Sequence, residues 1–163
     1  TLHHKTGGTM QVITDKKLYR SIWDKIYQEY FFSTQNEKWL CPDTTYDVYH
    51  LGEPWNEKQE AIVNQILCRI ISTEMYALDW QHDCFIFKPT ENIPFGYQYY
   101  DLERDCSVYF PTYFPDGDYH FFISKDWSVG LFGHPWRNEL IVTGSALRKE
   151  IAKSADDLKI EKI

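Results

Sequence analysis

Residues 118–143 constrain the fold more than any other part of the sequence, because apolar runs rich in β-branched and aromatic residues alternate there with very short turns. Strands are predicted over residues 118–124, 128–132 and 139–143, with turns at 125–127 and 133–138. Strands joined by so few residues must run antiparallel, since a parallel crossover needs a dozen or more. The sequence therefore predicts an antiparallel meander.

Two segments before this meander have the spacing of amphipathic helices. Apolar side chains recur every four residues in two adjacent rows over residues 15–31, and Thr14 is expected to cap that helix. The same pattern extends over residues 57–74, where Asn56 and Gln59 have the spacing of a capping box. Each helix has a broad apolar stripe that must be buried against another element.

Further elements complete an α+β pattern. Short strands are predicted over residues 46–51, 78–86 and 106–114, a loop over 89–98 and a last helix over 145–153. Helices with wide apolar stripes are expected to cover the sheet. The expected fold is therefore a two-layer α+β domain, an antiparallel meander sheet of about five to six strands covered by two or three helices.

The length of 163 residues is that of one domain, expected to extend over residues 10–155. Residues 1–9 lack periodicity and are expected to be disordered or foreign to the natural chain, so His3 and His4 are not taken as ligands. Residues 156–163 are expected to be a charged tail that frays. No apolar run in the sequence is long enough to span a membrane.

The net charge of −7 disfavours binding to nucleic acids or anionic membranes, which need a basic surface, and permits a basic protein partner. Cys41, Cys68, Cys84 and Cys106 form no C-x-x-C pair, so no zinc site is expected. Because the sequence shows no apolar leader segment, these four cysteines are expected to be reduced thiols in a cytoplasmic protein. The sequence has no nucleophile-elbow or phosphate-loop motif, and no cofactor or metal is expected.

Three stretches of the chain resemble one protein family. They are MYALDWQHDCFIFKP at 75–89, FPDGDYHFFISKDWSVGLFGHPW at 114–136 and LIVTGSALRKEI at 140–151. Their Leu-Asp-Trp-Gln-His and His-Pro-Trp pieces are specific, and from the second helix onward the chain resembles the bacterial domain-of-unknown-function family 2716. The acid that usually follows His-Pro-Trp in that family is replaced here by Arg137. The resemblance implies no reaction, because the family has no established activity.

The first candidate site lies in the predicted strand at 78–86. Alternation places Asp79 and Asp83 on its outward face, and His82 with Trp80 on its inward face. A carboxylate beside an imidazole suits a general base or a metal site. The alternative is a buried histidine that bonds a backbone carbonyl.

The second candidate site is Asp118 with Tyr119. It follows residues 114–117, whose Pro and Gly positions are those of a type I turn. Asp118 is either an acid at the mouth of a strand or a turn residue that accepts neighbouring backbone N–H groups.

The third candidate site is the turn that carries His134, Trp136 and Arg137. A rigid Pro-Trp pair beside a titratable histidine suits a ring-shaped ligand or a peptide. The alternative is that Trp136 folds over the sheet edge and Gly133 supplies a positive φ. Trp127, in the preceding turn, is a further candidate for contact with a ligand or partner.

Two classes of function fit these features. The favoured class is a non-enzymatic protein-binding module, such as an immunity protein that neutralises a basic toxin, because acidic charge speeds association and Trp and Tyr anchor interfaces. The alternative is a small enzyme or small-molecule sensor with a pocket lined by His82, Asp118, His134, Trp136 and Arg137. Exposed aromatic residues or an unpaired edge strand would also allow a homodimer.

Overall fold

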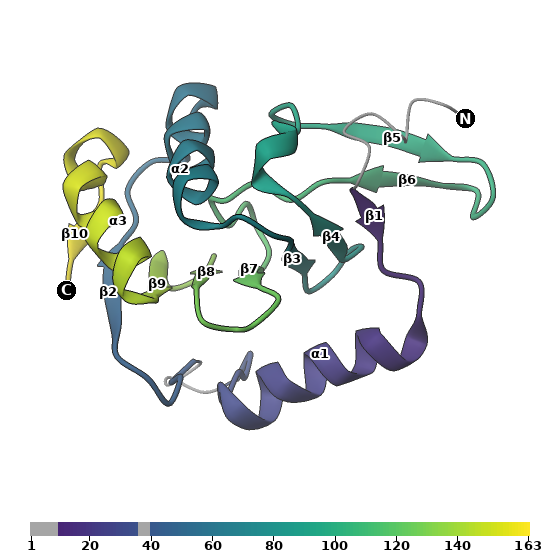
Figure 1. The fold of residues 1–163 in the computed structure, drawn as a ribbon, viewed down its shortest axis with the longest axis horizontal. Coiled ribbons are helices and arrows are strands. Elements are labelled where there is room, and N and C mark those ends of the chain that lie inside the picture. Colours follow the sequence, from purple (N-terminus) through teal and green to yellow (C-terminus); the bar gives the residue numbers. More distant parts are fainter. Residues whose placement is uncertain (1–9, 36–39) are drawn as a thin grey trace.

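Three α-helices and ten β-strands make up the described part of the chain, residues 10–35 and 40–163, in this computed structural model (Figure 1). The helices are α1 (Lys16–Glu29), α2 (Glu57–Ile70) and α3 (Ser145–Leu158). The strands are β1 (Gln11–Val12), β2 (Tyr46–His50), β3 (Met75–Asp79), β4 (Phe85–Phe87), β5 (Gln98–Asp101), β6 (Cys106–Tyr109), β7 (His120–Ser124), β8 (Gly130–His134), β9 (Glu139–Thr143) and β10 (Glu161–Lys162). The predictions for residues 1–9 lie outside the described residues.

Side-chain caps set where the first two helices begin. Asp15, rather than the predicted Thr14, caps α1, and its carboxylate accepts the backbone N–H of Lys17 at 2.9 Å. The predicted capping box of α2 is confirmed, because the side chains of Asn56 and Gln59 each accept the other's backbone N–H at 2.9 Å. Both caps satisfy N–H groups that have no partner inside the helix.

Eight of the strands form one antiparallel sheet in the order β1-β4-β3-β7-β8-β9-β2-β10. The predicted meander is confirmed at its centre, where β7, β8 and β9 are neighbours. The sheet has more strands than the five to six predicted. Two of the extra strands, β1 and β10, have two residues each and are too short to show a hydrophobic period of their own.

The stretch predicted as one strand over residues 78–86 is a hairpin instead. Strand β3 ends at Asp79 and β4 begins at Phe85. The carboxylate of Asp79 accepts the backbone N–H groups of Gln81 at 3.1 Å and His82 at 3.2 Å, which stabilises the turn between the strands. Asp79 is therefore buried and His82 exposed, the reverse of the predicted faces.

A second hairpin, β5–β6, projects beyond the main sheet (Figure 1). Its first strand begins at the end of the predicted loop over residues 89–98, and the predicted strand over 106–114 shortens to β6, which pairs with β5. The chain then leaves the hairpin toward α2. There the carboxylate of Glu60 accepts the backbone N–H groups of Tyr113 at 2.8 Å and Phe114 at 3.0 Å.

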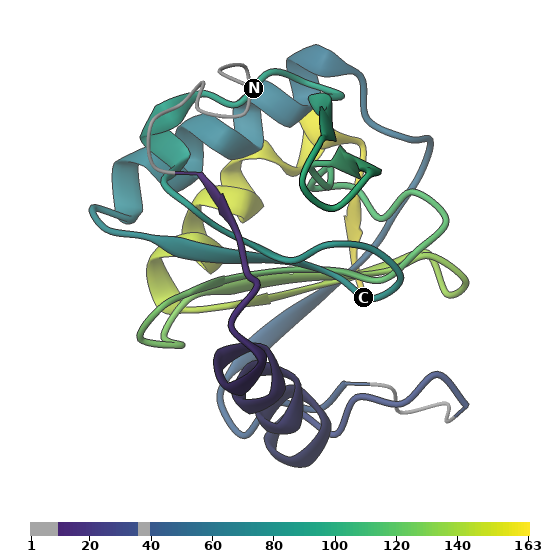
Figure 2. The same ribbon diagram turned by 90° about the vertical axis from the view of Figure 1, so that its right-hand side faces the viewer.

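Helices cover both faces of the sheet, so the domain has three layers rather than the predicted two (Figure 2). Helices α2 and α3 bury Val63, Leu67 and Leu147 against one face. Helix α1 buries Trp23 and Ile26 against the other face. The physical reason lies in the central strands, because every residue of β3, β7 and β8 is buried, and a sheet that is apolar on both faces needs two covers. The α+β class is confirmed.

Residues 156–163, expected to fray, are part of the packed fold. Helix α3 continues to Leu158, which is fully buried, and β10 pairs with β2 beyond it. The indole N–H of Trp55 donates a hydrogen bond to the carbonyl of Leu158 at 2.9 Å. Among the described residues, no helix has the length and apolar character needed to cross a membrane.

Candidate functional site at one edge of the sheet

Three loops meet at one end of the central strands of the main sheet. In the strand register, Asp79 at the end of β3 lies opposite His120 at the start of β7, and His120 lies opposite Gly133 of β8. Three segments are therefore at the same end of these strands: the β3–β4 turn, the segment that enters β7 and the β8–β9 turn (Figure 2). All of the predicted site residues except Trp127 come from these three loops or the strand ends beside them.

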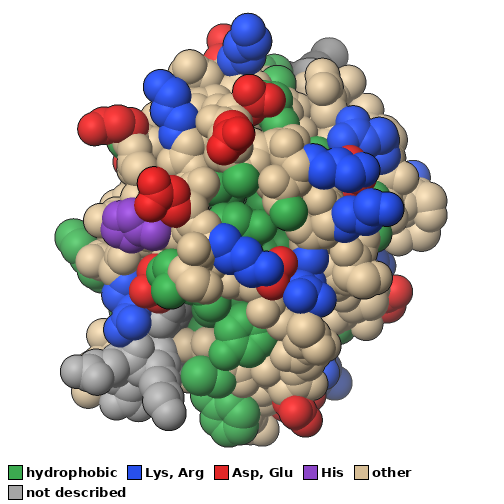
Figure 3. Space-filling view, turned by 90° about the vertical axis from the view of Figure 1, so that its left-hand side faces the viewer, with side chains coloured by type: hydrophobic (Ala, Val, Ile, Leu, Met, Phe, Trp, Pro, Cys, Tyr) green, Lys and Arg blue, Asp and Glu red, His purple; other side chains and the backbone are tan. Residues whose placement is uncertain are grey.

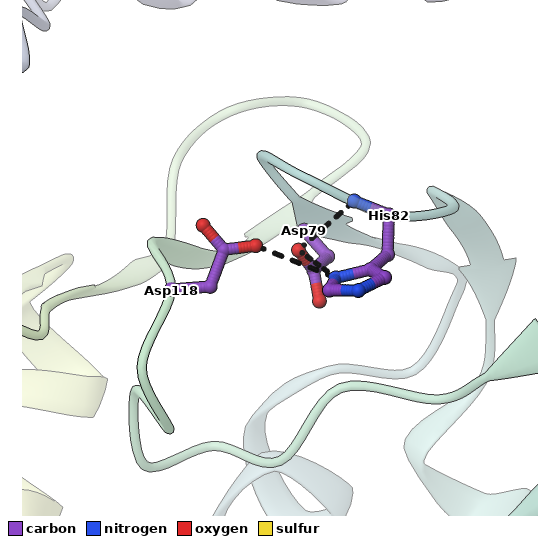
Figure 4. Close-up of side chains that lie close together, drawn as sticks. All are labelled: Asp79, His82 and Asp118. Atoms are coloured by element: carbon purple, nitrogen blue, oxygen red, sulfur yellow. Dashed lines mark hydrogen bonds and ion pairs between the residues drawn. The ribbon is translucent and has the colours of Figure 1, made fainter.

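Asp79, His82 and Asp118 form a compact cluster (Figure 4). The Nδ1 atom of His82 lies 3.1 Å from Oδ1 of Asp79 and 3.6 Å from Oδ2 of Asp118. Asp79 and Asp118 are buried, whereas the side chain of His82 is 52% exposed. The imidazole is the part of the cluster that solvent reaches, so the alternative of a buried core histidine is wrong for His82.

Asp118 also joins two of the loops. Its Oδ2 accepts the backbone N–H of Gln81 at 2.9 Å, and its Oδ1 accepts that of Tyr119 at 2.7 Å. Asp118 thus accepts a backbone N–H of its own turn, as predicted for a turn residue, and also one from the β3–β4 turn. Burial and the neighbouring carboxylate of Asp79 raise the pKa of Asp118 to about 6. Of the two carboxyl groups, Asp118 is therefore the one that takes up a proton first.

His120 is the buried partner of Asp79, and the sequence analysis missed it. Its Nε2 lies 3.4 Å from Oδ2 of Asp79, and its Nδ1 lies 2.8 Å from the carbonyl oxygen of Thr112. Both ring nitrogens face acceptors, an arrangement that favours the imidazolium form of the ring. The available signal was the alternation in β7, which places His120 on a buried face of the sheet.

The protonation states of Asp79 and His120 support each other. Burial by itself lowers the pKa of His120, but the carboxylate of Asp79 and the carbonyl of Thr112 offset this and raise it above its ordinary value. Burial by itself raises the pKa of Asp79, but hydrogen bonds with His120 and Asp118 hold it well below its usual range. The result is a buried ion pair directly beneath the exposed ring of His82.

His134 faces the other side of the sheet. Successive residues of a strand point to opposite faces, so His134 faces away from Gly133 and packs against Tyr119, with ring centroids 4.7 Å apart. Its Nδ1 accepts the backbone N–H groups of Trp136 at 3.2 Å and Arg137 at 3.1 Å. Burial, together with the charge of Arg137, lowers the pKa of His134 to about 4. His134 is therefore a neutral turn residue, on the face opposite Asp79.

The β8–β9 turn differs from the predicted alternative in two ways. Trp136 does not fold over the sheet edge, because it is 73% exposed. Gly133 does not have a positive φ; the positive value in this turn belongs to Asn138, at 51°. Gly133 is instead required by a close approach, since a Cβ atom there would lie 2.8 Å from the ring of Pro115.

The remaining aromatic candidates make structural contacts. The indole N–H of Trp80 donates to the hydroxyl of Tyr27 on α1 at 2.8 Å, and the Trp80 ring packs edge-on against Tyr119. Trp127 lies in the β7–β8 turn, at the opposite end of the central strands, where the Lys25 ammonium is 5.1 Å from its ring centroid. Trp80 thus contacts α1, across the sheet from the Asp79–His82–Asp118 cluster. Trp127 lies at the far end of the strands from that cluster.

A cavity of about 260 Å³ opens between α2 and the segments that lead into and out of the β5–β6 hairpin. Its wall includes Glu60, Asn64 and Tyr113, and the hydroxyl of Tyr113 donates to the amide oxygen of Asn64 at 2.6 Å. Burial raises the pKa of Glu60 to about 7, although two backbone N–H donors and His120 act to lower it. The sequence carried no signal for this buried acid, because it stands among exposed polar residues of the first helical turn.

The buried carboxyl of Glu60 predicts a pH-dependent stability. Its folded pKa is above the ordinary value, so its contribution is present at low pH and is lost as pH rises through about 7. Between about pH 5 and pH 7, we expect the free energy of unfolding of the wild type to fall by about 2 kcal/mol relative to Glu60→Gln. Urea denaturation at both pH values measures this. Glu57→Gln, in the exposed first turn of the same helix, is the control, and parallel pH profiles for wild type and Glu60→Gln would contradict the prediction.

Comparison with known proteins assigns the chain to a family. A family model described as "Protein of unknown function (DUF2716)" matches residues 13–147. The "Uncharacterized protein YxiI" of Bacillus subtilis (strain 168) is 41% identical over 78 residues, which is 47% of this chain and 43% of that protein. The match therefore spans less than half the length of this relative. No solved structure matches the chain. The family match covers most of the domain, including all three loops of the candidate site, and the chain belongs to the DUF2716 family.

Proposed function

We propose that the protein is a non-enzymatic protein-binding module for a basic partner, as an immunity protein that neutralises a basic toxin would be. The observation that supports this most is the concentration of acidic charge around one hairpin. Residues 79–118 contain eight acidic and two basic residues, which is most of the net charge of −7, and all of the eight except Asp79 and Asp118 are at least partly exposed. Acidic charge gathered in one region attracts a basic partner and raises the rate of association.

The β5–β6 hairpin and the β3–β4 turn form an acidic–aromatic surface. Its members are the exposed side chains Tyr100, Leu102 and Tyr109, and the acidic side chains Asp83, Asp101, Glu103 and Asp105. The face at the opposite end of the molecule, which carries α3 and β10, shows Lys and Arg side chains interspersed with Asp and Glu side chains (Figure 3). The two signs of charge are mixed on that face, whereas the acidic–aromatic surface has four acidic side chains and one basic side chain, Arg104.

Ion pairs hold the acidic–aromatic surface in one conformation. The guanidinium of Arg104 at the hairpin tip bonds both carboxylate oxygens of Asp83, at 2.9 and 3.1 Å, and Oδ2 of Asp101 at 2.8 Å. On the inner side of the hairpin, Tyr99 packs against the hydrophobic core. A surface fixed before binding loses less conformational entropy on association, and its tyrosines are suited to anchor an interface.

The alternative of a small enzyme or sensor receives less support. It needs His82, Asp118, His134, Trp136 and Arg137 to line one pocket. The ring of His134 packs on the α1 face of the sheet, whereas the Asp79–His82–Asp118 cluster lies across the sheet from it. The cavity beside Glu60 and two further cavities, one beside the start of α2 and one over α1, are lined by none of these five side chains.

The proposed function is tested by affinity capture followed by measurements on the purified pair. The immobilised protein is exposed to its native lysate at low salt, and a retained protein is identified, purified and titrated calorimetrically. We expect a basic partner whose affinity falls at least tenfold in Tyr109→Ala and decreases further as salt is raised. Tyr19→Ala, a partly exposed tyrosine of α1, is the matched control. A lack of any retained partner, or equal weakening by both variants, would overturn the proposal.

A further inference from the structure

The strongest unassigned feature of the molecule is the convergence of three donor atoms from separate positions of the chain. Asp79 ends β3, His82 lies in the β3–β4 turn, and Asp118 precedes β7. Their donor atoms, one from each side chain, all lie within 4.8 Å of one another (Figure 4). Asp118 is 36 or more residues away from the other two, so tertiary structure alone brings the three together.

The spacing of these atoms matches that of ligands around one metal ion. The Nδ1 of His82 is 3.1 Å from Oδ1 of Asp79 and 3.6 Å from Oδ2 of Asp118. Ligands at tetrahedral Zn²⁺ stand about 3.4 Å apart, given metal–ligand bonds of about 2.1 Å. The two separations that involve His82 bracket this value, and the donor atoms of all three side chains lie within 4.8 Å of one another, so an ion can enter after modest movements of the side chains.

Groups outside the donor set hold the carboxylates in place. His120 pairs with the other oxygen of Asp79, at 3.4 Å, and is itself fixed by the carbonyl of Thr112. The backbone N–H of Tyr119 bonds the other oxygen of Asp118 at 2.7 Å. Such supporting hydrogen bonds are what orient carboxylate ligands in metal sites. Each carboxylate oxygen has two lone pairs. Oδ2 of Asp118 accepts one backbone N–H, that of Gln81, and keeps a lone pair for an ion. Oδ1 of Asp79 accepts two backbone N–H groups, at 3.1 and 3.2 Å, so one of these hydrogen bonds must give way when an ion binds.

The charges of the cluster also favour a cation. Asp79 and Asp118 bring two carboxylates into a buried position, and the buried basic side chain that faces them is the single ring of His120. The nearby cation Arg104 is engaged by Asp83 and Asp101. A divalent ion bonded directly to both carboxylates would offset the remaining negative charge, whose burial is costly.

The donor chemistry selects the class of ion. An imidazole nitrogen together with carboxylate oxygens suits Zn²⁺ and similar transition-metal dications, whereas Mg²⁺ and Ca²⁺ take oxygen ligands. The half-exposed ring of His82 leaves one side of the cluster open to solvent. Three protein ligands with an open position for water is the arrangement of an accessible zinc site.

We propose that Asp79, His82 and Asp118 bind one divalent transition-metal ion of the Zn²⁺ class, with His120 as the residue that positions Asp79. This site goes beyond the proposed function, because it requires no protein partner. The sequence analysis named a metal site as one interpretation of the carboxylates and imidazole in residues 79–83, but it expected no metal.

Calorimetric titration of the purified full chain with ZnCl₂ and with MgCl₂ at neutral pH tests the proposal. We expect one Zn²⁺ per chain with a Kd below about 10 µM, and no binding of Mg²⁺ at the same concentrations. Titration with Co²⁺ gives a second readout, because visible absorption bands report a nitrogen- and oxygen-bound ion of low coordination number. His3 and His4 are replaced by alanine in every sample, so that this adjacent histidine pair cannot contribute.

Matched histidine variants locate the ion. His82→Gln removes the nitrogen donor at a half-exposed position and is expected to weaken Zn²⁺ binding at least tenfold and to abolish the Co²⁺ bands. His50→Gln, at an exposed histidine of β2, is expected to leave both unchanged. Asp118→Asn provides a second test at another ligand, with thermal melting to verify that it folds. Zn²⁺ affinity weaker than about 100 µM, equal effects of His82→Gln and His50→Gln, or a preference for Mg²⁺ would each overturn the proposal.

Discussion

Replacement of Asp79 by alanine is expected to lower the free energy of unfolding by about 3–5 kcal/mol, which is the cost of leaving one member of a buried ion pair without its partner. Asp79 is 5% exposed and opposes the buried imidazolium of His120. It also accepts the backbone N–H groups of Gln81 and His82, which the variant leaves without this acceptor. The loss is measured by urea denaturation at neutral pH.

Two further variants separate the ion pair from ordinary surface effects. Asp83→Ala removes a carboxylate from the same turn, but its pair with Arg104 is partly exposed, so we expect a loss of less than about 1 kcal/mol. Asp79→Asn is expected to cost less than Asp79→Ala, because its amide can still accept a turn N–H and can donate to a neutral His120. An Asp79→Ala cost no greater than that of Asp83→Ala would contradict the role assigned to this pair.

The pH dependence of this contribution has a definite sign. The pKa of Asp79 is lowered, so its contribution is present above the ordinary aspartate value of about 4 and is lost as pH falls. The pKa of His120 is raised, so its contribution is lost as pH rises through that raised value. The difference in stability between wild type and Asp79→Ala should therefore be largest between these two limits.

Replacement of Gly133 by valine is expected to cost about 3 kcal/mol of stability, because the site has no room for a side chain. A Cβ atom there would lie 2.8 Å from both Cγ and Cδ of Pro115 and 2.9 Å from its Cβ. The proline ring is stiff and buried, so the clash must move backbone in β8 or in the segment that enters β7. Thermal and urea denaturation measure the loss.

A double-mutant comparison tests this cause directly. Pro115→Gly removes the three atoms that lie nearest to the new Cβ, so in that background the additional cost of Gly133→Val should fall by at least half. Gly96→Ala is a control for loss of glycine alone, since nothing lies within 4 Å of a Cβ there, although its φ of 72° adds some backbone strain. Equal costs of Gly133→Val in the two backgrounds would show that Pro115 is not the constraint.

Local patterns in the sequence were sufficient where one segment determines its own conformation. The four-residue rows of α1 and α2, the capping box at Asn56, and the meander of β7, β8 and β9 all follow from nearby residues. The alternation predicted for residues 118–124 is also confirmed, since Tyr119, Phe121 and Ile123 face α1. The role of the turn after His134 was likewise predictable, although its positive φ belongs to Asn138 rather than Gly133.

The same patterns failed where a distant residue decides the outcome. Alternation across residues 78–86 suggested one strand, but the carboxylate of Asp79 accepts two N–H groups of a turn. This turn is further held by Asp118, which precedes the neighbouring strand β7. The predicted number of layers was wrong for a related reason. Apolar periodicity shows that a helix face is buried, but it does not show which face of the sheet buries it.

The sequence by itself determined the α+β class, the positions of most helices and strands, the antiparallel centre of the sheet and the likeness to a family. Only the tertiary structure decided that three layers form, that His82 is exposed while His120 is buried, and that Asp79, His82 and Asp118 meet while His134 lies across the sheet. The physical reason is that hydrogen-bonded turns and hydrophobic periods act over a few residues. The candidate site depends instead on the register of β3 against β7, which places side chains about 40 residues apart in one ion-pair network.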